Sequence, residues 1–142
     1  MIFPDTKIVT SEAETSALAE EFANILTAGA IVCLNGNLGS GKTYFVKSIC
    51  SYFGIDSASS PSFGIVNEYS SKPKIIHFDF YRIKKVEELY DIGFDDYLSQ
   101  KDSIVFIEWA NMFQEILPKK YYQLNFSIVD EFTREIIFKK NE

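Results

Sequence analysis

The chain has 142 residues, a net charge of −6 and an apolar fraction of 46%, which describe one globular domain with a single core. A surplus of 20 acidic over 14 basic residues argues against a protein that mainly grips nucleic acid by its phosphates. No apolar run approaches the roughly 18 residues of a membrane span and no signal-peptide pattern begins the chain, so we expect a cytoplasmic location.

The first predicted element is a helix over residues 11–28. Ser11 and Glu14 have the spacing of a capping box, apolar residues then recur with helical period, and Gly29 follows as a stop signal. Residues 30–35, AIVCLN, form an uninterrupted apolar run. Such a run is typical of a strand that is buried on both faces.

The remaining elements alternate between helix and strand. A second helix follows a glycine-rich segment and ends at Gly54. After it the patterns predict strands over 63–69 and 74–80, a short helix over 86–93, a buried strand over 103–109, and strands over 121–129 and 132–138. The last two alternate cleanly and pair as an antiparallel hairpin. We therefore predict a single α/β domain over 1–142, with a mixed β-sheet flanked by helices and an antiparallel C-terminal hairpin.

Residues 36–43, GNLGSGKT, match the pattern G-x-x-x-x-G-K-[ST] between a predicted strand and a predicted helix. Glycines let backbone N–H groups turn inward around phosphate oxygens, and the helix N-terminus adds unsatisfied donors and a positive dipole end. Lys42 can reach the β- and γ-phosphates, and the Thr43 hydroxyl can coordinate Mg²⁺. We interpret this segment as a phosphate-binding P-loop.

Two carboxylates follow buried strands, where each must be solvated or paired. Glu108 is interpreted as a ligand of the metal or of metal-bound water, with a capping role as the alternative. Asp79 is interpreted as a magnesium-shell or water-orienting residue. His77, the single histidine, is expected to be a hydrogen-bonded core residue. For Trp109, plain packing and contact with the nucleotide site are equal alternatives.

Five segments in this order resemble the TsaE family, once called YjeE: GNLGSGKT, SPSFGIVNEY, HFDFYR, ELYDIGFDDYL and VFIEW. The resemblance implies a P-loop NTPase-like fold and a cytoplasmic, Mg²⁺-dependent ATPase. It further implies work with the TsaB–TsaD pair, which attaches threonylcarbamoyl to adenosine 37 (t6A) of tRNAs reading ANN codons. Contact with tRNA would be indirect.

The resemblance also implies roles for single residues. The triphosphate would lie on residues 38–43, the metal on Thr43 and Glu108, and Asp79 would be the second essential acid. Around the nucleotide it implies Glu12 and Arg134, where a guanidinium can stack on adenine or neutralise phosphate; a plain surface arginine is the alternative. The residues assigned to ATP are Glu12, Leu38, Gly39, Ser40, Gly41, Lys42, Thr43 and Arg134, and those assigned to catalysis are Lys42, Asp79 and Glu108.

The chain departs from the family pattern at three places. Asn37 replaces the usual aspartate after the first glycine, and Ser62, in a segment that resembles a switch-like loop, replaces the usual threonine. The acid that often follows the E-W pair is missing. The first change removes a charge, the second keeps a hydroxyl, and the third puts any role of that acid in doubt here.

Other P-loop classes fit less well. A small-molecule kinase needs an arginine-rich lid, and the chain has two arginines, Arg82 and Arg134. A GTPase needs an [NT]KxD guanine reader, which the sequence lacks. A small P-loop kinase and a nucleotide-dependent switch, whose output is partner binding, stay as alternatives.

Overall fold

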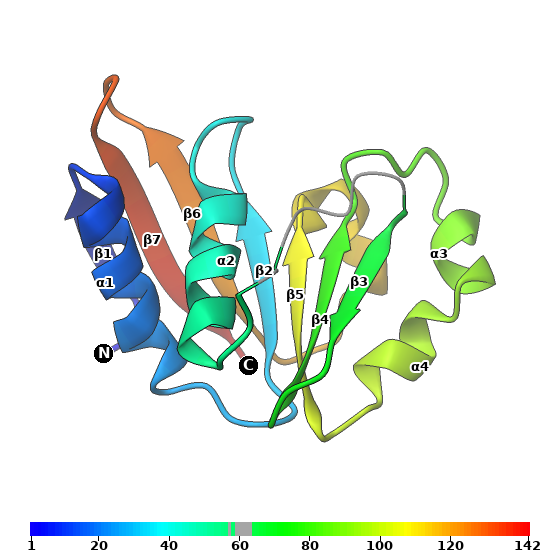
Figure 1. Cartoon of the computed structure of the whole chain (residues 1–142). Helices are drawn as coiled ribbons and strands as arrows, with labels where there is room; N and C mark the ends of the chain where they lie inside the picture. The colour runs from blue at the N-terminus through cyan, green and yellow to red at the C-terminus, as the bar shows by residue number, and fades with distance from the viewer. Residues whose placement is uncertain (57, 59–63) are drawn as a thin grey trace.

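The computed structural model describes residues 1–56, 58 and 64–142. These residues form one seven-stranded sheet with the order β1-β7-β6-β2-β5-β4-β3 (Figure 1). The strands are β1 (Asp5–Val9), β2 (Ile31–Asn35), β3 (Val66–Tyr69), β4 (Lys74–Asp79), β5 (Ser103–Glu108), β6 (Tyr121–Ile128) and β7 (Arg134–Asn141).

The sheet is mixed, as predicted. Strands β6, β2, β5 and β4 pair in parallel, whereas β7 and β3 run antiparallel to their neighbours and β1 pairs antiparallel with β7. Parallel partners on both sides, together with burial of both faces, explain the apolar run in β2. The predicted C-terminal hairpin is confirmed as the β6–β7 pair.

Helices cover both faces of the sheet (Figure 1). One face packs against α1 (Glu12–Ala23) and α2 (Lys42–Tyr52), and the other against α3 (Glu87–Asp91), α4 (Phe94–Leu98) and the 3₁₀ helix η1 (Ala110–Ile116). Alternate residues of β2 enter the two cores: Val32 and Leu34 face α1 and α2, and Ile31 and Cys33 face the opposite side. The central strands therefore hold their carboxyl ends in fixed positions.

Cys33 and Cys50 are buried free thiols. Burial raises the pKa of Cys33 to about 12 and that of Cys50 to about 11, so both thiols stay protonated near neutral pH. No helix in the described part of the chain is long and apolar enough to cross a bilayer.

The first helix is shorter than predicted. Ser11 caps it as expected, accepting a hydrogen bond from the Glu14 N–H at 3.1 Å, but the Glu14 carboxylate bonds back to the Thr10 N–H at 2.8 Å. The predicted end at residue 28 is wrong, because the chain leaves the α-helix after Ala23 through tighter i→i+3 hydrogen bonds. This turn brings the Gly29 N–H to the Ser103 carbonyl at 2.7 Å and so delivers the chain to β2.

Three elements were not predicted: β1, α4 and η1. The strand predicted over 63–69 begins at Val66, although the Ile65 carbonyl still accepts a hydrogen bond from the Asp79 N–H at 3.0 Å. Phe63 and the switch-like segment around Ser62 lie outside the described residues. The helix predicted over 86–93 ends at Asp91, and α4 begins after Gly93. The last strand spans Arg134–Asn141 rather than 132–138, because Phe132 and Thr133 complete the turn.

Candidate nucleotide-binding site

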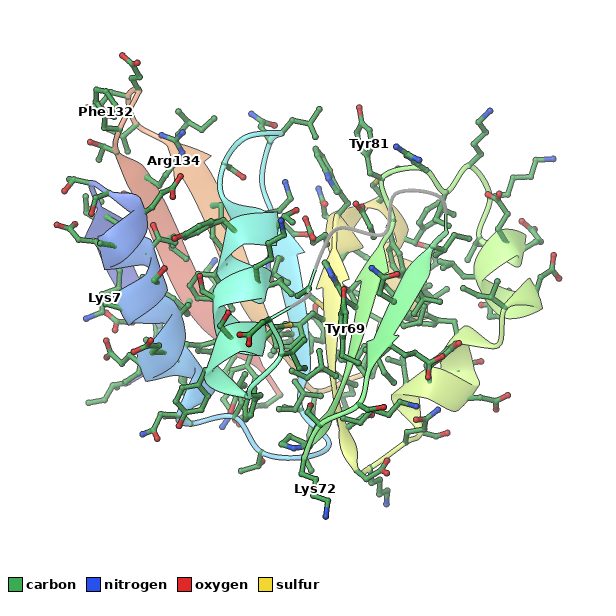
Figure 2. The ribbon with its side chains drawn as sticks, viewed as in Figure 1. Lys7, Tyr69, Lys72, Tyr81, Phe132 and Arg134 are labelled. Atoms are coloured by element: carbon green, nitrogen blue, oxygen red, sulfur yellow. The ribbon has the colours of Figure 1, made fainter. Side chains whose placement is uncertain are left out.

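A cavity of about 540 Å³ opens at the carboxyl ends of β2, β5 and β4, the usual place for a ligand in an open α/β sheet. The P-loop forms its floor, the start of α1 forms one wall, and Glu131, Phe132 and Arg134 at the β6–β7 turn form another. Figure 2 shows Phe132, Arg134 and Tyr81 at this edge of the molecule and Lys72 at the opposite edge.

The glycines of the P-loop let a ligand or a neighbouring strand come close to its backbone. Gly39 and Gly41 have φ of +80° and +105°, a left-handed conformation that glycine adopts readily. A Cβ at Gly36 would lie 2.7 Å from the Phe126 carbonyl oxygen, so no side chain fits there. Helix α2 has no side-chain N-cap, which leaves its first N–H groups as donors at the cavity.

Ser40 supplies a second sign of an anion site. Its hydroxyl is buried and makes no hydrogen bond to any residue that the structure describes. Buried hydroxyls are normally paired, and an unpaired one marks a place where a ligand oxygen or water belongs. Phosphate oxygens would satisfy both Ser40 and the helix donors.

Lys42 lies at the base of the loop with only 4% of its surface exposed. Its Nζ donates to the carbonyls of Gly36 and Asn37, the second at 3.1 Å, and lies 4.2 Å from the Trp109 ring centroid. Burial lowers the pKa of Lys42, while the charges of Glu108 and Asp79 act in the opposite direction. The loop therefore holds a positive charge in place before any ligand binds.

Glu108 joins the P-loop helix to the central strands. The Thr43 hydroxyl donates to its carboxylate, at 2.9 Å to Oε1 and 3.1 Å to Oε2. His77 Nε2 lies 2.6 Å from Oε2, and both side chains are buried. The prediction of a hydrogen-bonded core histidine is thus confirmed, and its partner is an acid of the predicted site.

Asp79 lies beside Glu108, because the two residues are partners in the β4–β5 register. Its Oδ1 accepts a hydrogen bond from the Tyr81 N–H at 3.0 Å. Burial raises the pKa of Asp79, and the charge of Glu108 adds to that shift. The two predicted acids therefore line one cavity, as their positions at strand ends suggested.

Trp109 lines the cavity and also packs against a neighbouring ring. Its backbone has φ of 60° and ψ of 34°, the one left-handed non-glycine residue in the described ranges. This conformation turns the chain out of β5, and the ring lines the cavity beside Lys42 and Tyr81, whose ring centroid lies 5.0 Å away.

Glu12 and Arg134 line the opposite wall of the cavity. Arg134 donates to backbone carbonyls of its own turn, at 2.8 Å to Asp130 and 3.1 Å to Thr133, and to the Gly39 carbonyl at 3.3 Å. These hydrogen bonds tie the hairpin turn to the P-loop.

Comparison with known proteins identifies the family. The family model described as "Threonylcarbamoyl adenosine biosynthesis protein TsaE" matches residues 9–136. This chain belongs to the TsaE family. A curated TsaE protein of Rickettsia bellii is 37% identical over 130 residues, covering 89% of each chain, and one of Bacillus subtilis is 34% identical over 127 residues, covering 88% of this chain and 78% of the relative.

A solved structure supports the same fold. The crystal structure of Bacillus subtilis YdiB superimposes with a TM-score of 0.76 and 27% sequence identity, and the match covers 99% of this chain and 87% of that one. The two proteins therefore share the fold over nearly all of this chain.

The donor set of this TsaE-family cavity fits a magnesium ion that arrives with a nucleotide. No cluster of three or more His, Cys, Asp or Glu side chains able to hold a metal occurs within residues 1–56, 58 and 64–142. Mg²⁺ commonly takes only one or two carboxylates and completes its shell with phosphate and water. Thr43, Glu108 and Asp79 provide such a partial oxygen set at the loop.

Sequence reasoning missed several cavity residues. Thr10 and Tyr81 line the site, and Phe132, with 71% of its surface exposed, stands at the rim. Tyr81 could have been suspected from its place two residues after Asp79. Thr10 and Phe132 carry no local signal, because only the packing of β1 and β7 brings them to the P-loop.

Proposed function

We propose that this TsaE-family protein binds ATP and Mg²⁺ in the P-loop cavity and hydrolyses ATP. By this reaction it supports threonylcarbamoyl modification of adenosine 37 (t6A37) in tRNAs reading ANN codons, in the cytoplasm and together with the TsaB–TsaD complex. The observation that carries the proposal is the Thr43–Glu108 hydrogen bond of 2.9 Å, which joins the P-loop to a buried acid. The family description supplies the pathway.

The residues divide the chemistry between them. The P-loop N–H groups and the buried Lys42 bind the triphosphate. The Thr43 hydroxyl donates a hydrogen bond to Glu108, which leaves the lone pairs of the Thr43 oxygen for a cation. Magnesium, when bound, neutralises charge on the β- and γ-oxygens. Asp79, whose raised pKa reflects a partly dry environment, can accept a hydrogen bond from the attacking water.

The far wall of the cavity suits the nucleoside. Glu12 offers a carboxylate, Arg134 a planar guanidinium, and Phe132 an exposed ring. Flat cationic and aromatic groups stack on a purine base. The chain lacks an [NT]KxD motif, so we expect adenine nucleotides to be favoured over guanine nucleotides.

The proposal includes slow hydrolysis by the protein alone. Lys42 and Arg134 are the cations that line the cavity among the described residues, and the guanidinium of Arg134 is held by backbone carbonyls. An arginine added by a partner raises phosphoryl transfer to water by roughly 10³- to 10⁵-fold in other P-loop proteins. We therefore expect the TsaB–TsaD pair to stimulate hydrolysis and, given the net charge of −6, to hold the tRNA itself.

Reconstitution of t6A formation tests this function. TsaB–TsaD, threonylcarbamoyl donor and tRNA would be combined with the wild-type chain, with Lys42→Ala, or with Lys47→Ala, which changes an exposed lysine on the same helix. We expect multiple-turnover t6A formation with the wild type and Lys47→Ala and its loss with Lys42→Ala. Equal t6A formation without the chain, or transfer of phosphate to a small molecule, would contradict the proposal.

A further inference from the structure

His77 stands out among the residues to which the proposed function assigns no role. It is a polar side chain with 2% exposure inside a strand whose neighbours Ile76 and Phe78 are fully buried. An apolar residue would fill this place without the cost of desolvating an imidazole. Packing alone therefore does not explain a histidine at position 77.

The reason lies on the neighbouring strand. His77 and Asp79 are two residues apart on β4, so their side chains point to the same face of the sheet. Their register partners on β5 are Phe106 and Glu108, which point to that face as well. His77 thus lies one step deeper in the sheet than the two acids. From there its Nε2 reaches Glu108 Oε2 at 2.6 Å.

This contact determines how Glu108 can face the cavity. An ionised carboxylate only accepts hydrogen bonds, so beside ionised Glu108 the donor is Nε2. Charge-assisted bonds of this length are strong and directional. His77 contacts Oε2 of Glu108, and the Thr43 hydroxyl lies 2.9 Å from Oε1 and 3.1 Å from Oε2, so the carboxylate is held between these two side chains.

We propose that His77 is a positioning residue for the metal-binding pair: through its Nε2–H it fixes the carboxylate of Glu108 and, through Glu108, the hydroxyl of Thr43. The inference rests on the proposed function of Glu108 and Thr43 and extends it to a residue that touches no ligand. Loss of such an outer partner lowers metal affinity or activity by about 10- to 100-fold.

Two variants separate positioning from packing. His77→Leu keeps similar bulk but removes the donor, whereas His77→Gln keeps an N–H at a similar distance along the side chain. Ile75→Ala is the control, because Ile75 is fully buried on the same strand and the same face but belongs to the apolar core around α1 and α2. It destabilises the sheet without removing a polar contact of Glu108.

We would measure ATP affinity by titration calorimetry at several Mg²⁺ concentrations, which gives the Mg²⁺ dependence of ATP binding. For His77→Leu we expect the half-saturating Mg²⁺ concentration to rise about 10- to 100-fold, with ATP affinity in the absence of Mg²⁺ unchanged. His77→Gln should recover most of this loss, and Ile75→Ala should match the wild type. Wild-type Mg²⁺ dependence in folded His77→Leu, or the same loss in Ile75→Ala, would overturn the inference.

A second readout needs neither ATP nor a folded leucine variant. Because His77 is the single histidine, its ring gives one set of ¹⁵N-imidazole signals in NMR. We expect a slowly exchanging, downfield Nε2–H proton in the wild type that moves upfield in Glu108→Gln. An unprotonated Nε2 would refute the inference, whereas a wild type that binds no Mg²⁺·ATP but keeps this proton would refute the proposed function alone.

Discussion

At the scale of single residues, the site depends on a few polar groups that are buried before a ligand arrives. Lys42 is held by two loop carbonyls and the Trp109 ring, and Glu108 by Thr43 and His77. Their side chains need little reorganisation on binding, so more of the interaction energy is available to the ligand.

Lys42→Ala should abolish useful ATP binding. The change removes a buried charge that would pair with phosphate, and truncating one member of such a pair costs about 2–5 kcal/mol, or at least about 30-fold in affinity. Calorimetric titration with ATP measures the loss, with exposed Lys47→Ala as the matched control. Equal ATP affinity of Lys42→Ala and the wild type would remove the basis of the P-loop interpretation.

Glu108→Gln should keep the fold and lose Mg²⁺-dependent hydrolysis. Glutamine has the same shape and one carbonyl acceptor for Thr43, but it lacks the negative charge that a cation needs. Melting temperature and ADP release at saturating ATP and Mg²⁺ would be measured together. ADP release at the wild-type rate would show that Glu108 is not the metal acid.

Much of this residue set could be predicted from sequence. Lys42 and Thr43 belong to a contiguous motif, and Asp79 and Glu108 follow apolar runs, so parallel pairing of β4 and β5 was enough to bring the acids together. The contact of His77 with Glu108 could not be predicted, because an isolated histidine gives no sign of which strand lies beside it.

At the scale of elements, the P-loop depends on its fit against β6. Gly36 has φ of +151° and lies close to the backbone of Phe126, whereas Gly54, at the end of α2, has φ of +83° and open space around it. Both have a positive φ, but only Gly36 is crowded.

Gly36→Ala should therefore be more harmful than Gly54→Ala. Both variants place a side chain on a residue with positive φ, but only the first forces a methyl group to 2.7 Å from a carbonyl oxygen and from Ser40 Oγ. Overpacking of this kind adds about 1–3 kcal/mol of destabilisation. Urea unfolding of the two variants, with ATP titration of each, would show the difference; equal stability would mean that the loop moves away from β6 without cost.

The β3–β4 hairpin carries a pH-dependent contact. Glu68 accepts from Lys74 at 2.7 Å and from the Tyr97 hydroxyl at 3.2 Å, which links the hairpin to α4. The hydrogen bond from Lys74 and its charge hold the pKa of Glu68 below its usual range. A lowered carboxyl pKa adds stability above the unfolded-state value and loses it as the pH falls through the folded-state value.

Glu68→Gln should accordingly be slightly less stable than the wild type at pH 7. The pair is solvent-exposed, so we expect a difference of only about 0.2–1 kcal/mol. The difference should shrink as the pH falls below about 4, where the wild-type carboxylate also becomes neutral. Thermal melts across pH would test this, with Glu21→Gln, which changes an exposed glutamate on α1, as the control. A stability difference between Glu68→Gln and the wild type that does not change with pH would rule out the ionic contribution.

Element prediction succeeded where patterns were long and failed where tertiary contacts decide. The buried strands β2 and β5 and the alternating β6 were predicted within one residue at each end. Strand β1 was not predicted because it is a five-residue edge strand with mixed exposure that pairs with β7, near the end of the chain. The early end of α1 was not predicted because it depends on the contact between Gly29 and β5, which has no local sequence signal.

At the scale of the whole molecule, the fold gathers segments from both ends of the chain around one cavity. The start of α1, the P-loop, the ends of β4 and β5, and the β6–β7 turn meet at one edge of the sheet (Figure 1). A bound nucleotide would touch all of these segments. A partner protein that docks at that edge could therefore change nucleotide binding, and nucleotide binding could change docking.

The most direct test of the account is the rate of Mg²⁺-dependent ADP release by the wild-type chain, measured against added TsaB–TsaD. We expect slow ATP hydrolysis by the protein alone and a clear increase that saturates with the partner complex and is absent in Lys42→Ala. This follows because the described cavity holds two cations, one of them tied to backbone carbonyls. A fast rate for the isolated chain, unchanged by TsaB–TsaD, would contradict it.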